Sequence, residues 1–360
     1  MANRVVWRAL IKLTAASVIV LQACGTTPPG SISVSPFPST ASTPIPAVAS
    51  GTPPAQTQGP IVATGEEWIS FQWADTSGAD GIFLVRPDGT GQHQLVADLP
   101  GSQRHPDWSP DGERLTFVHA PPGKPDELWM VDADGTDAKR LLSCDLPCNA
   151  FNYPDWAPDG TAIYFGLDAD AKPDAPPTTF EVARFDIATG KVTTVLTRKD
   201  GQTAEQPRIS PDGAHVVFDR GEIVATTGMA IYVADLNGGP ERRITDPKLF
   251  GAHPDWSIDG RIVFNSYDLG FFQDTTEPAN LYVMQADGTK LRALTTYGDH
   301  DTRATQPRFT PDGTGIVYTQ VDGEGYGTRR LAFMNADGTG QRWLTPEPIS
   351  GTHPQLRPVP

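Results

Sequence analysis

The stretch HPDWSPDG, residues 105–112, decides the fold of this chain because five further copies of the pattern follow it. They read YPDWAPDG (153–160), QPRISPDG (206–213), HPDWSIDG (253–260), QPRFTPDG (306–313) and a shortened HPQLRPVP (353–360). Successive copies begin 47 to 53 residues apart, a period typical of proteins that repeat one supersecondary unit.

Each copy is followed by the same succession of short strands and tight turns. After the first copy come the runs 115–118, 128–131 and 139–142, which are bounded by turn residues as in a β-meander. The Ser-Pro-Asp-Gly and Ala-Asp-Gly-Thr segments supply proline and glycine where tight turns need them. With the strands labelled a to d, the a–b and c–d turns share one face, and the b–c and d–a loops share the other.

A four-stranded meander cannot bury its apolar side alone, so the units are expected to stack in a ring. The predicted fold class is all-β, a six-bladed β-propeller of four-stranded antiparallel blades. Residues 68–73, 82–85 and 94–97 supply strands b, c and d without a preceding strand a, and the tail 353–360 supplies a lone strand a. We therefore expect pairing of the C-terminal strand with the N-terminal blade to close the ring.

One repeat position holds a bulky apolar residue in every copy. We expect it to pack between blades as core. Its occupants are Trp108, Trp156, Ile209, Trp256, Phe309 and Leu356.

The strings PDWSPDG (106–112), LYVMQADGT (281–289) and RALT (292–295) resemble the repeat of TolB-type β-propellers. The resemblance covers roughly residues 65–360, and we assign 61–360 to the propeller domain. Because TolB-like propellers generally engage partner proteins, the resemblance implies a binding role, although one fold can host many functions.

Residues 1–23 read as a lipoprotein signal peptide, with basic residues followed by an apolar run at 13–21. The sequence LQAC at 21–24 resembles a bacterial lipobox, which implies cleavage before Cys24 and lipidation of its thiol. A transmembrane anchor is the alternative, but the apolar run is short for a membrane span.

Residues 24–60 are rich in Pro, Ser and Thr and nearly free of charge, so they are expected to form a disordered linker. The prediction is an exported protein of the bacterial cell envelope. The lipid on Cys24 would hold it at the outer face of the cytoplasmic membrane or in the inner leaflet of an outer membrane.

Cys144 and Cys148 are the two remaining cysteines, and they lie in one predicted d–a loop. Export favours a disulfide over a metal pair. The net charge of −15 argues against nucleic acid as a partner and against a basic membrane-docking surface.

The residue directly before each repeat proline begins the innermost strand near the predicted channel; we call this the axial position. Its occupants are His353, His105, Tyr153, Gln206, His253 and Gln306. These side chains are either solvated or hydrogen-bonded, or they are metal ligands, since neutral imidazole binds zinc, copper, iron or manganese. The repeat also resembles propeller uronate lyases, and that resemblance implies a divalent metal held by His105, His253, His353, Gln206 and Gln306.

Four arginines lie near the channel: Arg104, Arg208, Arg303 and Arg308. In a lyase they would meet substrate carboxylates. The favoured alternative for Arg208 and Arg308 is an ion pair with an aspartate of a neighbouring blade, among Asp107, Asp155 and Asp255.

The b–c loops 167–179, 220–228 and 267–279 are long and varied, and such loops on a rigid scaffold commonly bind. With the four arginines, the candidate ligand- or partner-binding residues are Tyr153, Tyr267, Phe271 and Phe272.

We conclude from the sequence that the chain is a non-catalytic, cell-envelope binding scaffold acting through its b–c and d–a loop face. No Gly-x-Ser-x-Gly nucleophile motif occurs, no catalytic residue is assigned, and no cofactor is expected. The partner is an envelope protein or a carbohydrate, the membrane is contacted only through the lipid, and the chain is expected to be a monomer. The alternatives are a metal-dependent uronate lyase with a central His/Gln site and a purely structural envelope component.

Overall fold

The computed structural model describes residues 62–63, 65–74, 79–145, 148–169, 179–198, 202–221, 228–266, 279–298, 302–323, 328–345 and 351–359. The chain divides into two units, Met1–Ala49 and Ser50–Pro360, and every described residue belongs to the second. The predicted signal peptide, Cys24 and the whole predicted linker lie outside the described residues. Within those ranges no helix is long and apolar enough for a membrane span.

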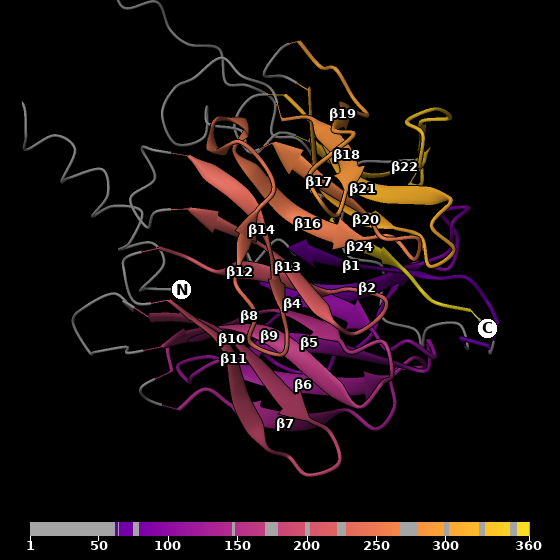
Figure 1. Cartoon of the computed structure of the whole chain (residues 1–360). Helices are drawn as coiled ribbons and strands as arrows, with labels where there is room; N and C mark the ends of the chain where they lie inside the picture. Colours follow the sequence, from indigo (N-terminus) through magenta and orange to yellow (C-terminus); the bar gives the residue numbers. More distant parts are fainter. Residues whose placement is uncertain are drawn as a thin grey trace, which may run out of the picture. The chain divides into compact units, whose positions relative to one another are not determined.

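The described residues form six four-stranded antiparallel sheets, the blades of a propeller (Figure 1). From the innermost strand outward, blade 1 consists of β24 (Gly351–Leu356), β1 (Ile69–Ala74), β2 (Asp80–Val85) and β3 (His93–Gln94). Blade 2 consists of β4 (Ser102–Trp108), β5 (Arg114–Ala120), β6 (Glu127–Asp132) and β7 (Lys139–Ser143). Blade 3 consists of β8 (Ala150–Trp156), β9 (Ala162–Ala169), β10 (Thr179–Asp186) and β11 (Val192–Arg198).

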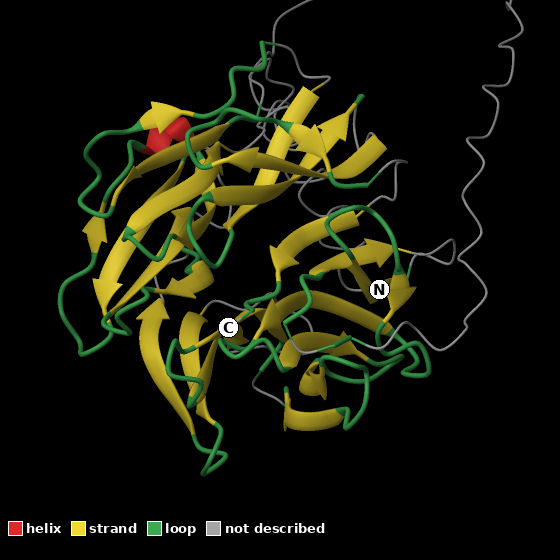
Figure 2. Ribbon diagram, turned by 90° about the vertical axis from the view of Figure 1, so that its right-hand side faces the viewer, coloured by secondary structure: helices red, strands yellow, loops and turns green. Residues whose placement is uncertain are grey.

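Blades 4 to 6 follow the same order. Blade 4 consists of β12 (Glu205–Ile209), β13 (His215–Gly221), β14 (Met229–Asp235) and β15 (Arg242–Arg243). Blade 5 consists of β16 (Gly251–Trp256), β17 (Arg261–Ser266), β18 (Leu281–Gln285) and β19 (Arg292–Ala293). Blade 6 consists of β20 (Thr302–Phe309), β21 (Gly315–Asp322), β22 (Thr328–Asn335) and β23 (Arg342–Trp343). A 3-10 turn, η1 (Pro247–Leu249), lies between blades 4 and 5 (Figure 2).

The predicted six-bladed, all-β propeller is confirmed. Each innermost strand contacts the innermost strands of both neighbouring blades, which closes a ring. In blade 1, β24 pairs antiparallel with β1, with Leu356 opposite Ile69. The first and last described strands therefore meet in one sheet, as predicted from the incomplete repeats.

The outermost strand of blade 1 is shorter than the sequence indicated, whereas that of blade 2, β7, covers the predicted residues 139–142. Strand d of blade 1 covers only His93–Gln94 instead of residues 94–97. The preceding c–d turns are held by their own side chains. In blade 2, for example, Asp134 accepts hydrogen bonds from the backbone N–H and the hydroxyl of Thr136, at 2.9 and 2.6 Å. An edge strand without an outer partner has only these turns and a few ladder bonds to hold it.

The core lies between adjacent blades and is built as six apolar clusters. The residues predicted to pack there do so: Trp108, Trp156, Ile209 and Phe309 are buried, and Trp256 and Leu356 are partly buried. Each cluster draws on two neighbouring sheets, so no blade completes its core without the next one.

Candidate functional site

All six axial residues adopt a left-handed backbone. Their φ angles lie between 48° and 56°, although none is glycine. The ladder between strands a and b shifts register at each of these positions, so every innermost strand has a bulge there. This conformation costs on the order of 1 kcal/mol per residue, and the ring must supply compensating contacts.

The axial side chains pack against one another across the channel. The ring of His105 stacks on that of Tyr153, with centroids 4.0 Å apart, and His353 meets His105 edge-on at 4.9 Å. Nε2 of Gln306 and Nε2 of His353 are 3.1 Å apart. The space left among the axial residues of blades 1, 3, 4, 5 and 6 is about 10 Å³. That volume is close to the smallest that holds one water molecule.

The backbone N–H groups of the axial residues are held by side chains from the preceding blade. Gln72 accepts from His105 at 3.2 Å, and Asp219 accepts from His253 at 3.2 Å. Likewise, Asn265 accepts from the N–H of Gln306 at 3.1 Å. These side-chain oxygens accept hydrogen bonds from backbone N–H groups that, because of the bulges, have no partner in the strand ladder.

Two axial histidines are neutral at pH 7. Burial lowers the pKa of His253 to about 4, and burial also lowers the pKa of His353 well below its ordinary value. Of the polar atoms here, Gln206 Oε1 and His253 Nδ1 are buried and have no hydrogen-bond partner among the described residues. The imidazoles of His253 and His353 therefore contribute polar but uncharged groups to the axial ring.

A second ring of contacts is formed two residues after the axial position. We call this the bridge position, and its occupants are Asp107, Asp155, Arg208, Asp255, Arg308 and Gln355. An acidic or amide side chain here accepts a backbone N–H in the next blade, at 2.6 to 3.0 Å. The pairs are Gln355 with Trp108, Asp107 with Trp156, Asp155 with Ile209, and Asp255 with Phe309.

The arginines at the bridge position form the ion pairs that the sequence favoured. Nη1 of Arg208 lies 2.8 Å from Asp155 Oδ1 and 3.0 Å from Asp107 Oδ1, and Arg308 lies 3.0 Å from Asp255. Burial and the neighbouring Asp155 raise the pKa of Asp107 to about 7, although Arg208 opposes the rise. These pairs hold both guanidinium groups between blades.

The two other candidate arginines lie toward the loop face and are also engaged. Arg104 Nη2 contacts Asp126 Oδ2 at 2.9 Å, and Arg303 Nη2 donates to the carbonyl of Gly323 at 3.1 Å. Tyr153 belongs to the axial cluster rather than to a loop. The predicted loop residues Tyr267, Phe271 and Phe272 lie outside the described residues.

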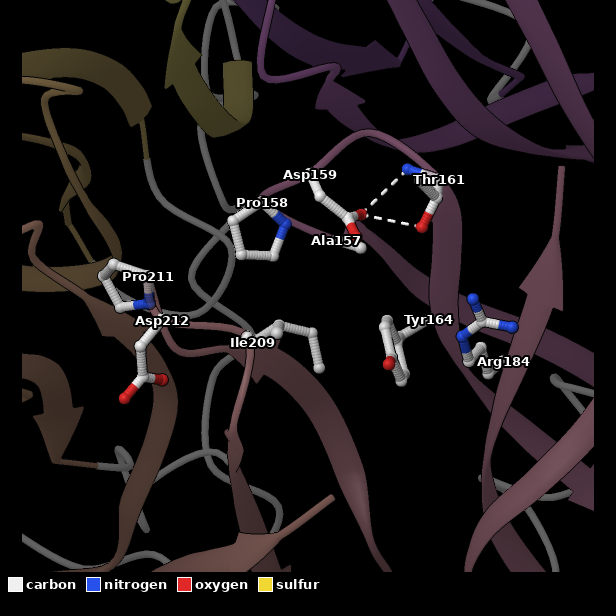
Figure 3. A pocket seen from close by; sticks show the side chains of 10 residues that line it. Ala157, Pro158, Asp159, Thr161, Tyr164, Arg184, Ile209, Pro211 and Asp212 are labelled. Atoms are coloured by element: carbon white, nitrogen blue, oxygen red, sulfur yellow. Dashed lines mark hydrogen bonds between the residues drawn. The ribbon is translucent and has the colours of Figure 1, made fainter. Parts of the chain in front are cut away.

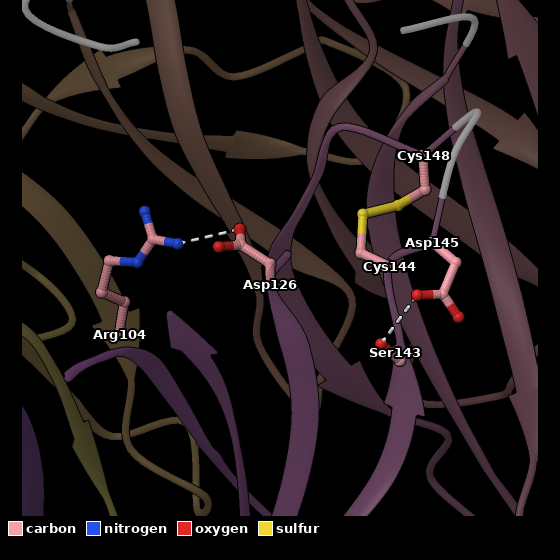
Figure 4. The surroundings of a disulfide bond; sticks show 6 residues. All are labelled: Arg104, Asp126, Ser143, Cys144, Asp145 and Cys148. Carbon is pink, nitrogen blue, oxygen red and sulfur yellow. Dashed lines mark hydrogen bonds and ion pairs between the residues drawn. A yellow bond between two sulfur atoms is a disulfide. The ribbon is translucent and has the colours of Figure 1, made fainter. Parts of the chain in front are cut away.

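A disulfide joins Cys144 and Cys148 in the d–a loop between blades 2 and 3 (Figure 4). Cys144 is 1% exposed and packs with the cluster between these blades. On the same face, Ser143 donates to Asp145 at 3.3 Å. The bond restrains a loop beside the Arg104–Asp126 ion pair.

The axial rings as placed lie against one another. The imidazole of His105 is stacked on Tyr153 with an interplanar angle of 24°, and the rings of His253 and His353 are 6.1 Å apart. Within the described part of the chain, no group of three His, Cys, Asp or Glu residues could hold a metal. We therefore derive no chemical step through one.

Residues 177–358 match the TolB beta propeller domain family. The chain belongs to that family. An uncharacterized protein of Agrobacterium fabrum is 30% identical to it over 145 residues, which are 39% of this chain and 47% of that protein. The segments matched to curated relatives cover less than half of each relative's length.

Two solved structures share the fold of this TolB-type propeller. TolB from Acinetobacter baumannii superposes with a TM-score of 0.62 and 19% identity, over 82% of this chain and 68% of that one. The oligogalacturonate lyase from Vibrio parahaemolyticus superposes with a TM-score of 0.52 and 16% identity, over 75% and 72%. At these identities the likeness concerns the fold alone.

The sequence analysis missed the strand b residues that support the axial ring, Gln72, Asp219 and Asn265. Each is a polar residue in an apolar strand, which is a usable signal because buried polar groups need partners. It also missed a hollow between blades 3 and 4 on the turn face, described below.

Proposed function

We propose that this TolB-type propeller is a non-catalytic binding scaffold of the bacterial cell envelope and that its partner, an envelope protein or a carbohydrate, docks on the b–c and d–a loop face. One observation supports this proposal above the others. The pocket among the axial side chains measures about 10 Å³, so a polymeric substrate has no room within it. A ligand then has to use the rims of the ring.

In blade 2, side chains hold the described loops of the loop face to the strands. Arg104 forms an ion pair with Asp126 at 2.9 Å. The ring of His119 contacts Glu127 at 3.0 Å and the carbonyl of Pro100 at 2.9 Å. These contacts tie loops of this face to the strands. Fixed loop ends reduce the entropy lost when a partner binds.

The experiment is site-specific photocrosslinking in cells, with matched positions on the two faces of blade 2. Lys124 is exposed in the b–c loop, and Glu113 is exposed in the a–b turn. A photoreactive residue at 124 should capture one discrete partner, and the same residue at 113 should not capture it. An identical pattern from both positions, or no product from 124, would contradict the proposed use of the loop face.

The metal-dependent uronate lyase is the competing hypothesis. It requires the axial rings to rotate away from the stacked arrangement. Elemental analysis of the purified full-length chain tests it directly. A stoichiometric transition metal that is lost in the His105→Ala and His353→Ala variants would replace the scaffold proposal with the lyase.

A further inference from the structure

Several blade junctions are filled on the turn face by an arginine of the chain itself. The guanidinium group covers the aromatic residue that packs between the blades. These pairs, with the distance from the guanidinium carbon to the ring centroid, are Arg114 over Trp156 (5.1 Å), Arg261 over Phe309 (5.2 Å) and Arg357 over Trp108 (5.7 Å).

Two of these arginines also donate to the same atom of the neighbouring blade, the glycine carbonyl of its a–b turn. Nη2 of Arg261 lies 2.9 Å from the oxygen of Gly313, and Nε of Arg357 lies 2.7 Å from the oxygen of Gly112. Arg261 begins strand b, whereas Arg357 follows strand a, so different parts of the chain reach equivalent sites. The turn face therefore has a recurrent receptor for a guanidinium group.

The junction between blades 3 and 4 has this receptor but no arginine in the corresponding place. Ala162 begins strand b of blade 3, one residue before Ile163, which pairs with Trp156. Arg114 stands at the same register in blade 2, one residue before Leu115, which pairs with Trp108. The bulky residue that follows in blade 4 is the aliphatic Ile209.

A hollow of about 400 Å³ lies at this junction (Figure 3). This volume lies in the range of small-ligand sites, about 300–1,000 Å³. Pro158 and Pro211 border it on one side, and Tyr164 lies across it, with Ile209 between them. A Cβ added at Gly213 would meet only Pro158, at 3.9 Å, so the turn glycine is accessible.

Blade 3 also differs in the strands below the hollow. Tyr164 lies opposite Arg184 in the ladder between β9 and β10. The residues that pair at the same place in other blades include Val217 with Val233, Val263 with Val283 and Val317 with Phe333. The hollow thus has a tyrosine and an arginine where these three blades have two apolar residues.

The charges around the hollow favour a cation. The carboxylates of Asp159 and Asp212 line it, and each uses Oδ1 to hold its own turn. Their turn hydrogen bonds lower the pKa of both groups, so both are ionised at pH 7. The one lining cation, Arg184, is paired with Asp186 at 3.2 Å. Among described residues, no donor that we observe reaches the carbonyl of Gly213.

We propose that the hollow between blades 3 and 4 binds an arginine side chain of a partner protein, as the chain's own arginines bind at other junctions. The incoming guanidinium group would donate to the carbonyl of Gly213 and lie near the carboxylates of Asp159 and Asp212. Its aliphatic stem would contact Ile209 and the two prolines. This site is on the face opposite the loops, so it is independent of the partner proposed above.

The test uses the full-length chain with labelled isoleucine methyl groups and N-acetyl-arginine methylamide as the probe. The methyl of Ile209 reports from the hollow, and Ile258, which is 63% exposed on another a–b turn, serves as the internal control. We expect a saturable shift at Ile209 with a Kd on the order of 1 mM. The citrulline analogue, which has the same shape without the charge, should bind about fivefold or more weakly.

Two variants separate the site from unspecific binding. Ala162→Arg places an arginine at the register of Arg114 and should abolish the shift. Because Ala162 is 0% exposed, the melting temperature of this variant is measured to check its fold. The double variant Asp159→Asn, Asp212→Asn keeps an acceptor oxygen in each turn but removes both charges, and it should weaken arginine binding without unfolding the blade. Equal binding of arginine and citrulline, shifts that avoid Ile209, or unchanged binding by the double variant would overturn the proposal.

Discussion

The carboxylate of Asp107 in blade 2 accepts the backbone N–H of Trp156 in blade 3 with one oxygen and a hydrogen bond from Arg208 in blade 4 with the other, both at 3.0 Å. One side chain therefore links three blades. A residue of an innermost strand can link three blades in this way because the bulge at the axial position turns the residues after it toward the neighbouring sheets.

Replacing Asp107 by Ala is expected to reduce the free energy of unfolding by about 3–5 kcal/mol, because it leaves a buried arginine short of one carboxylate and a buried N–H without an acceptor. Urea unfolding followed by tryptophan fluorescence measures the change. The control is Lys124→Ala in an exposed loop, which should stay within about 0.5 kcal/mol of the unmodified chain. A loss below about 1 kcal/mol for Asp107→Ala would mean that the bridge position does not join the blades energetically.

Arg357 is predicted to hold the closing strand. Its guanidinium group is 2% exposed and donates to the carbonyls of Gly112, Ala63 and Glu66 at 2.7 to 3.2 Å. Arg357→Ala should cost about 3 kcal/mol or more, since charge-assisted hydrogen bonds are among the stronger ones. Limited proteolysis should then remove the C-terminal strand first. Protection equal to that of the unmodified chain would show that β24 is held by its ladder alone.

His253 should make the propeller less stable in mild acid. Its pKa is about 4 in the folded chain and about 6.5 when unfolded, so between these values the unfolded state binds more protons. Stability is therefore lost as the pH falls from about 6.5 to 4, by up to about 3 kcal/mol from this one group.

The variant His253→Gln removes the titrating group and suits the backbone, because Gln206 and Gln306 adopt the same left-handed conformation. Denaturant midpoints measured at pH 7, 6, 5 and 4 should fall less steeply for this variant. Parallel pH profiles for the two chains would rule out a neutral buried imidazole at this position.

The Cys144–Cys148 disulfide is expected in protein isolated from an oxidising compartment. Peptide mapping without reductant should find the two cysteines linked, and reduction should add two hydrogens to that peptide. The double variant to Ser should lower stability by about 2 kcal/mol, near the low end for disulfides because the loop is short. Free thiols in the isolated, unreduced chain would contradict this prediction.

Much of the architecture was predictable because it depends on repetition. The recurrent proline, aspartate and glycine of the turns set the strand boundaries, and the lone C-terminal copy indicated how the ring closes. The outermost strand of blade 1 was harder to place because few ladder bonds hold it. Nothing local in the sequence marks where strand d of blade 1 ends.

The candidate site was predicted only in part. The axial residues could be recognised as a converging set, but a repeat position does not say whether aromatic rings stack or point nitrogen atoms at a common centre. That depends on the left-handed bulge, which aims each side chain, and on the residues across the channel. The structure places His105 against Tyr153, a contact between different repeats that no spacing encodes.

The sequence by itself determined the number of blades, the closing strand and the pairing of arginine with aspartate between blades, because each follows from local turn chemistry or from complementary residues at one repeat position. Only the tertiary structure decided that the axial side chains pack against one another and that blades 3 and 4 leave a hollow. Both depend on the volumes of side chains that meet between blades. The space left between those side chains depends on residues that are far apart in the chain.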